Sequence, residues 1–281
     1  MRPLFFLSLL APAFASASEG GVNPRATDLF YIGGIPVSNS ILTTWIITAL
    51  IIIAIRVLVG TPRIVPSKGQ ALVESMASGL RDALEPIVGK RMIGKVFPTL
   101  CGFFVFILLM NWSGLLPGVG TIKYGESGHW VDAIRPATSD LNTTLALSVI
   151  SFVAWTYFVL RYAGFKVLIF DLFGNKADRK ELNFPMWIML SFIFLGVGGV
   201  EVVSILFRLI SLSFRLYGNV FGGENLIHAL GDIAPYVIPA GAGLLEVLVG
   251  LIQAFVFTLL SAVYIGLICN HEGGHEEEHA H

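Results

Sequence analysis

Long runs of apolar residues dominate the pattern of hydrophobic and polar positions along this chain. Four of them have at least the length of one membrane crossing, and they predict spans at residues 40–60, 97–118, 141–161 and 240–269. A helix needs about 20 apolar residues to cross the hydrocarbon core of a bilayer. The pattern therefore predicts a polytopic transmembrane helical protein.

A fifth helical pattern, over residues 183–230, is too long for a simple crossing and contains no proline after Pro185. A helix over these residues would extend about 70 Å at a rise of about 1.5 Å per residue, more than twice the hydrocarbon thickness. It has to tilt steeply, kink, or run partly outside the lipid. The predicted fold class is all-α, with about five membrane helices.

A sixth helix is predicted between the first two spans. Residues 69–89 have helical periodicity, and Glu74, Arg81 and Asp82 lie on its polar face. Such a segment is typical of an amphipathic helix that lies on the membrane surface.

The distribution of charge gives an orientation. Only 13% of the residues are charged, about half the share in soluble domains, which excludes that class. Basic residues gather in the loops at 61–96 and 161–180, which lie on the same side of the second and third spans. By the positive-inside rule that side is the cytoplasm, so the N-terminus lies outside and the C-terminus inside. The basic residues are too few and scattered for a nucleic-acid partner.

The two ends of the chain differ from its centre. Residues 1–17 have the short basic start, apolar core and small-residue end of a signal peptide, which indicates a bacterial inner membrane. The alternative is a short uncleaved hydrophobic tail. Residues 18–39 then form an extracytoplasmic segment, and residues 40–269 form a single membrane domain. The His/Glu-rich tail, 270–281, is interpreted as flexible; metal binding is its less favoured alternative, and no cofactor or metal is predicted.

Ionisable residues inside the predicted spans are the candidate functional groups. Glu201, Arg208 and Arg215 are spaced by seven residues, so they share one stripe of a helix, and Asn219 lies close to it. Glu224, nine residues after Arg215, lies almost on the opposite side.

Two more features complete this set. His228 shares the face of Glu224, and Glu246 and Gln253 share a stripe of the last helix. Glu224, His228 and Glu246 can bind and release protons, whereas an arginine keeps its charge. This contrast favours a proton pathway beside a fixed charge. The alternatives are a buried structural ion pair, and for His228 a packing role.

The segments SLSFRLYGNVFGGE (211–224) and LLEVLVGLIQAFVFTLLSAVYI (244–265) resemble subunit a of F-type ATP synthases. Weaker likenesses occur at 97–118, at 137–148 and in the loop helix. The resemblance runs from about residue 35 to 268. It implies that the last two helices are long and tilted in the membrane.

The resemblance also implies roles for single residues. Arg215 corresponds to the family's essential arginine, which faces the rotating c-ring, and Gln253 lies opposite it. Glu224 and Glu246 correspond to positions lining the half-channel open to the outside. The remaining positions implied in proton translocation are Asn219 in the arginine motif, Asp140 and Asn142 at the channel mouth, and Glu201 toward the cytoplasmic exit.

The function implied is a proton-translocating stator subunit that couples proton flow to ATP synthesis without catalysing bond chemistry. Its implied partners are the c-ring subunits, the b subunits of the peripheral stalk, the rest of the complex and membrane lipid. The alternative is a self-contained proton- or sodium-coupled carrier, although we find no internal repeat of the kind typical of carriers. A purely structural anchor would leave the Arg215 set unexplained. The coupling ion, H⁺ or Na⁺, stays open.

Overall fold

The computed structural model describes residues 26–116, 119, 123–124, 131–132, 134–165, 184–233 and 237–269. Within these ranges five helices are long and apolar enough to cross a membrane, which confirms the predicted all-α polytopic class. They are α2 (Asn39–Val59), α4 (Lys90–Ser113), α5 (Leu141–Phe158), α7 (Phe184–Ile233) and α8 (Val237–Cys269). The predicted signal peptide and the C-terminal tail lie outside the described residues.

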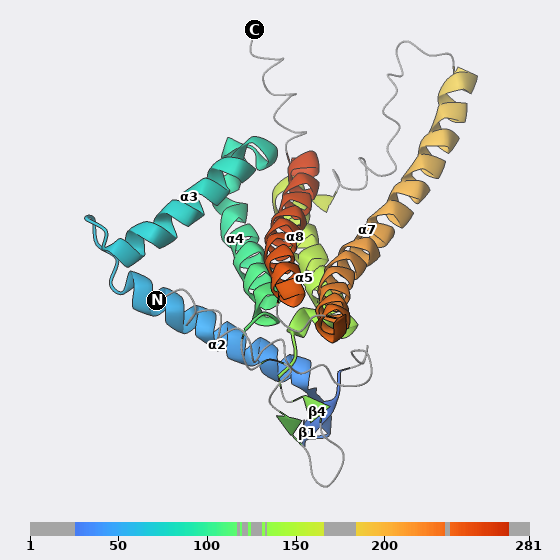
Figure 1. The fold of residues 1–281 in the computed structure, drawn as a ribbon. Helices are drawn as coiled ribbons and strands as arrows, with labels where there is room; N and C mark the ends of the chain where they lie inside the picture. Colours follow the sequence, from blue (N-terminus) through green and yellow to red (C-terminus); the bar gives the residue numbers. More distant parts are fainter. Residues whose placement is uncertain are drawn as a thin grey trace.

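The helices form a bundle with two distinct ends (Figure 1). Helices α4, α5 and α8 lie side by side, and the second half of α7 packs against α5 and α8. The short helix η1 (Ala137–Ser139) and the N-termini of α2, α5 and α8 lie at one end, which we call the hairpin end. The amphipathic helix α3 (Lys68–Val88) and the C-terminus of α8 lie at the other, the α3 end.

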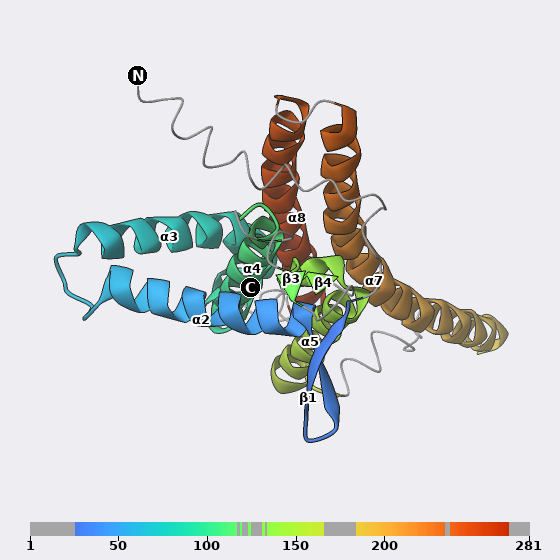
Figure 2. The same ribbon diagram turned by 60° about the horizontal axis from the view of Figure 1, so that its bottom comes forward.

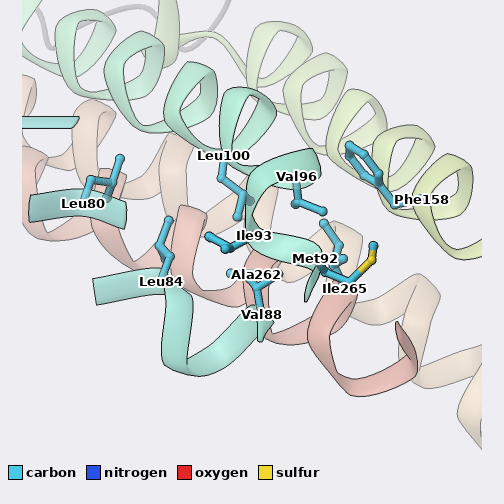
Figure 3. Close-up of a cluster of buried hydrophobic side chains, with 10 residues drawn as sticks. All are labelled: Leu80, Leu84, Val88, Met92, Ile93, Val96, Leu100, Phe158, Ala262 and Ile265. Atoms are coloured by element: carbon cyan, nitrogen blue, oxygen red, sulfur yellow. The ribbon is translucent and has the colours of Figure 1, made fainter. Parts of the chain in front are cut away.

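Helix α3 is fixed to the bundle by its C-terminal half. Its side chains Leu80, Leu84 and Val88 are buried against α4 and α8, while Leu72 and Met76 on its first half are exposed. Figure 3 shows this cluster, in which α3, α4, α5 and α8 each contribute apolar side chains. The sequence predicted an amphipathic helix correctly, and the structure adds that part of its apolar face covers protein.

Helix α4 begins earlier than the sequence predicted. The predicted span starts at residue 97, but the helix begins at Lys90 and Pro98 lies inside it. Met92, Ile93 and Val96 are buried in the cluster of Figure 3. Their burial stabilises the additional turns and offsets the hydrogen bond that proline cannot donate.

Three hydrogen bonds from side chains to backbone carbonyls join α8 to its neighbours. Trp112 Nε1 on α4 donates to the carbonyl of Val247 at 3.1 Å, and Asn111 Nδ2 donates to that of Gly250 at 3.2 Å. Trp155 Nε1 on α5 donates to the carbonyl of Tyr264 at 3.0 Å. These bonds satisfy polar groups at membrane depth and fix the position of α8 along its axis.

A β-hairpin precedes the first span and was not predicted. Strands β1 (Asp28–Ile32) and β2 (Ile35–Ser38) pair antiparallel around Gly33 and Gly34, whose φ angles are 58° and 87°. A two-residue turn of this kind needs positive φ at both positions, which glycine adopts without strain. The Gly-Gly pair between apolar residues was the signal available in the sequence. A second, shorter pair consists of β3 (Lys123–Tyr124) and β4 (Val131–Asp132).

Helix α7 accounts for the excess length of the fifth pattern. Its first half runs away from the bundle, and the helix bends before its second half runs beside α8 (Figure 2). The first half exposes apolar side chains on several sides, namely Phe192, Ile193, Leu195, Val197, Val200, Val203 and Phe207. A surface of this composition fits lipid or an apolar protein partner.

Candidate functional site

The hairpin end holds a buried arginine that the sequence analysis did not select. Arg135 is only 5% exposed, and its backbone N–H donates to Thr43 Oγ1 of α2 at 3.3 Å. Its Nε donates to Ser139 Oγ at 2.8 Å. The next residue, Pro136, packs so closely on α4 that a Cβ on Gly114 would lie 2.8 Å from its Cγ. The loop before α5 is therefore held by two helices, and Arg135 is held with it.

The guanidinium of Arg135 faces a carboxylate of α7. Arg135 Nη2 lies 3.8 Å from Glu224 Oε2, and the side chain of Glu224 is 19% exposed. A second carboxylate lies beside this pair, because a Cβ on Gly223 would be 2.7 Å from Glu246 Oε1 of α8. One permanent cation and two carboxylates from three elements thus meet at the hairpin end; we call them the Arg135 cluster.

Asp140 and Asn142, both predicted site residues, lie at the start of α5 next to this cluster. Asp140 is buried and is the N-cap of α5, with Oδ1 accepting from the backbone N–H of Asn142 at 3.1 Å and from its side-chain amide at 3.3 Å. This cap gives Asp140 a structural role in its own right. The role of both residues at a channel mouth stays a prediction.

The middle of α7 is joined to α8 by a pair of amides. Asn219 Nδ2 donates to Gln253 Oε1 at 2.8 Å, and Gln253 is 4% exposed. The structure thus brings together two residues that the sequence predicted to be partners of the arginine motif. Their bond fixes the rotation of the two helices relative to each other at this level.

Arg215 lies one turn before Asn219 and is exposed. The neighbouring Phe214 is exposed with it, whereas Leu216 is fully buried in the core against α4 and α8. The helix therefore presents Arg215 on its outer face. A permanent charge at this depth is costly in lipid, which indicates that a partner or water covers this face.

A second charged pair lies further toward the first half of α7. Glu201 Oε1 lies 3.8 Å from Arg208 Nη2, and the seven-residue spacing had placed both residues on one stripe of the helix. The guanidinium of Arg208 lies over the ring of Tyr264, 4.0 Å from its centroid. Both residues of this stacked pair line a cavity of about 50 Å³ between α5, α7 and α8, together with Ser148, Ser151 and Ser261. His228 lies on α7, but its side chain is outside the described part of the structure.

Gly223 provides a test of the Arg135 cluster. For the proton translocation that the sequence resemblance implies, we expect Gly223→Val to reduce the rate by about 10-fold or more, because the new side chain displaces the carboxylate of Glu246 from its position beside Glu224. Dye-monitored proton uptake by membrane vesicles measures this. Gly102→Val on α4 is the control, since a Cβ there also meets nothing within 4 Å. Equal conduction by the two variants would contradict the expectation.

The described residues contain no group of three or more His, Cys, Asp or Glu side chains arranged to hold a metal ion. The site consists instead of acids and arginines on membrane helices and on the loop before α5. The fold and this site define a polytopic membrane protein with ionisable groups between its spans.

Comparison with known proteins gives the family. Residues 41–266 match the sequence profile described as "ATP synthase A chain". The "ATP synthase subunit a" of Moorella thermoacetica is 31% identical over 241 residues, which cover 86% of this chain and 95% of that protein. The "ATP synthase subunit a 2" of a Bradyrhizobium species is also 31% identical over 241 residues, covering 86% of this chain and 93% of that protein. The chain belongs to the ATP synthase A chain family, and is thus an a subunit of the membrane sector, Fo.

Proposed function

We propose that this chain is the proton-conducting stator subunit of its ATP synthase, with two half-channels that meet a rotating c-ring. Protons reach the ring through the Arg135 cluster and leave it past Glu201 and Arg208. The chain itself catalyses no bond chemistry; it converts proton flow into rotation. In this proposal the c-ring and the b subunits of the peripheral stalk are its direct partners.

The observation that carries the proposal is the separation of Arg215 from the titratable groups. Arg215 lies on the outer face of α7, whereas Glu224 turns to the interior, where it meets Arg135. Along the helix, Glu224 lies about 13 Å from Arg215 on one side and Glu201 lies about 21 Å from it on the other, at about 1.5 Å per residue. Carboxylates therefore exist on both sides of Arg215, and none of the described carboxylates of α7 lies at its level.

The permanent charge of Arg215 makes this separation effective. An arginine neither releases its proton nor passes one on, and its field repels protons that approach from either side. A proton has to leave the chain at one level and return at the other, which requires a carrier on the exposed face. A carboxylate on the ring fits this task, because Arg215 attracts its ionised form and favours release of its proton.

The outer face around Arg215 fits an apolar, closely packed partner. Phe207 and Phe214 are exposed there, and so are Gly218 and Gly222, where small residues allow a second helix to approach. The amide pair Asn219–Gln253 keeps α8 in register behind this face. We assign this face to the ring.

The charge distribution supports an orientation with the α3 end in the cytoplasm. Basic residues of the described loops and helix ends gather there, namely Arg63, Lys68, Arg81, Lys90, Arg91, Lys95 and Arg161. Positive charge is retained on the cytoplasmic side of bacterial membranes. The hairpin end and its Arg135 cluster then face the outside of the inner membrane, where protons enter during ATP synthesis.

The double variant Glu224→Gln/Glu246→Gln tests this function. We expect passive proton conduction, measured in vesicles stripped of the soluble head, to fall by about 100-fold, since positioned proton-transfer groups contribute at least this factor. Glu85→Gln is the control, because Glu85 lies on α3 and forms a partly exposed ion pair with Arg81. Vesicles that carry this variant should conduct protons normally. Normal conduction by the double variant would refute the proposed path. Proton uptake by the purified chain without a ring would favour a self-contained carrier.

A further inference from the structure

The cavity between α5, α7 and α8 has no role in the proposed function. Its volume is about 50 Å³, and it lies beside the stacked pair of Arg208 and Tyr264. We propose that this cavity binds ordered water, and that the water solvates the guanidinium of Arg208 on the side of the path where protons leave the ring. The inference rests on the proposed function, and it adds Ser148 of α5 as a positioning residue.

Ser148 supplies the first argument. Its side chain lines the cavity and is 1% exposed, yet its Oγ has no hydrogen-bond partner among the described residues. A hydroxyl left unpaired at membrane depth costs free energy, because lipid chains cannot satisfy it. A buried serine on a helix can bond to the carbonyl one turn earlier, as Ser261 does with Phe257 at 3.0 Å. Ser148 makes no such bond, so its hydroxyl is available to a molecule in the cavity.

The hydroxyl protons of Ser151 and Ser261 give the second argument. Ser261 Oγ donates its single proton to the carbonyl of Phe257, so in the 3.0 Å contact between the two serines Ser151 is the donor. Ser151 Oγ then keeps lone pairs that can accept a hydrogen bond. Ser148 and Ser151 are three residues apart on one face of α5, and both line the cavity. Their free donor and acceptor positions therefore open on the same space.

Arg208 supplies the donors that complete the site. Its guanidinium lies 4.0 Å from the centroid of the Tyr264 ring, and its Nη2 lies 3.8 Å from Glu201 Oε1, which is longer than a hydrogen bond. These two contacts leave N–H groups of the guanidinium that can donate to water. A water molecule that accepts from Arg208 and donates to Ser148 and Ser151 has three polar partners, the usual number for a buried water.

The size and the lining of the cavity favour water over a larger ligand. One water molecule needs about 10–15 Å³ of such space, so about 50 Å³ holds a small cluster. Much of the remaining lining is apolar, with Phe152, Ile205 and Leu209 among it. These side chains confine the water to the serines and Arg208. A cavity without polar groups would stay dry, and this alternative makes the opposite prediction for the variants below.

Two substitutions of the same shape test the water directly. Ser148→Thr and Ser148→Val both introduce a side chain branched at Cβ, and the two differ only in a hydroxyl or a methyl group. In the purified ATP synthase complex we expect the thermal midpoint of Ser148→Val to be lower than that of Ser148→Thr by at least about 2 °C, because valine leaves the water without one of its partners. A dry cavity gives the reverse order, since a buried methyl group adds hydrophobic stabilisation.

Thr156→Val is the matched control for the exchange of a hydroxyl for a methyl group. Thr156 lies on the same helix, and its Oγ1 donates to the carbonyl of Phe152 one turn earlier at 2.9 Å. Such a bond within one helix adds little stability, so the thermal midpoint of this variant should stay within about 1 °C of that of the unaltered complex.

Proton conduction measures the link between the water and Arg208. In vesicles stripped of the soluble head, we expect Ser148→Thr to conduct within about twofold of the unaltered complex. Ser148→Val should conduct about 10-fold more slowly, because a hydrogen bond to a charged group contributes at least this factor. Threonine thus restores what valine removes, although both side chains occupy the same space. An effect of the added volume alone would slow both variants equally.

The outcomes distinguish this inference from the proposed function. A thermal midpoint of Ser148→Val equal to or above that of Ser148→Thr overturns the water site. A density map of the unaltered complex decides the question if neither variant assembles: we expect ordered water within hydrogen-bond distance of Ser148 Oγ, and an empty cavity overturns the site. Equal conduction by the two variants overturns the link to Arg208. Normal conduction by the Glu224→Gln/Glu246→Gln variant overturns the proposed function but leaves the water site.

Discussion

Arg215→Gln is expected to abolish ATP-driven proton pumping while the complex still assembles. The side chain is exposed on the outer face of α7, so its replacement leaves the packing of Leu212 and Leu216 behind it intact. Pumping should fall by at least about 100-fold, since removing one partner of a desolvated charge pair costs about 3 kcal/mol at each passage of a ring carboxylate. Acidification of inverted membrane vesicles, followed with a pH-sensitive dye, measures the rate.

The control for this variant is Arg56→Gln. Arg56 is also an exposed arginine on a membrane helix, but it lies in the last turn of α2 and can reach the interface. The complex with Arg56→Gln should pump protons at a normal rate. Pumping by Arg215→Gln at the rate of this control would reduce Arg215 to a structural charge and remove the basis of the proposed mechanism.

Gly266→Ala is expected to lower the stability of the folded chain strongly. Helix α8 crosses the end of α3 at this glycine, and an added Cβ would overlap the backbone carbonyl oxygen of Ile87. A carbonyl at the end of a helix cannot swing aside as a side chain does, so the two helices have to separate. The cost should be about 1–3 kcal/mol. It appears as a lower thermal midpoint of the purified complex and as less chain in the membrane.

Gly94→Ala is the matched substitution on α4. A Cβ at this position meets nothing within 4 Å, so stability should be unchanged or slightly higher, as alanine favours the helical backbone. If the two variants have the same thermal midpoint, the packing of α3 against α8 does not depend on the close approach at Gly266.

The membrane helices could be predicted from the sequence because hydropathy reports directly on the solvent that surrounds each segment. The limits of α2, α5, α7 and α8 follow the predicted spans within a few residues. The start of α4 differs from the start of the predicted span, because its first turns are stabilised by contacts with α3 and α8. A local sequence pattern contains no information on such contacts. Pro98 lies inside that helix, where the same contacts offset the hydrogen bond that proline cannot donate.

The candidate site could be predicted only in part. Helical periodicity separated Arg215 from Glu224 correctly, and it placed Glu201 and Arg208, which form an ion pair, on one stripe. The pairing of Arg135 with Glu224 joins a loop to a helix far along the chain, and periodicity contains no information on such a contact. A single cation in a polar loop near Asp140 gave too weak a signal to select it.

The three bonds that end on backbone carbonyls of α8 have a consequence for sequence divergence. A carbonyl is present whatever residue occupies the position, so the acceptors at 247 and 264 survive almost any replacement of their side chains. Selection then acts on the donors, Asn111, Trp112 and Trp155, and on the small size of Gly250, against which Asn111 and Trp112 pack. The residues at outward-facing positions of α8 can therefore change, while these bonds keep the helix at the same position along its axis.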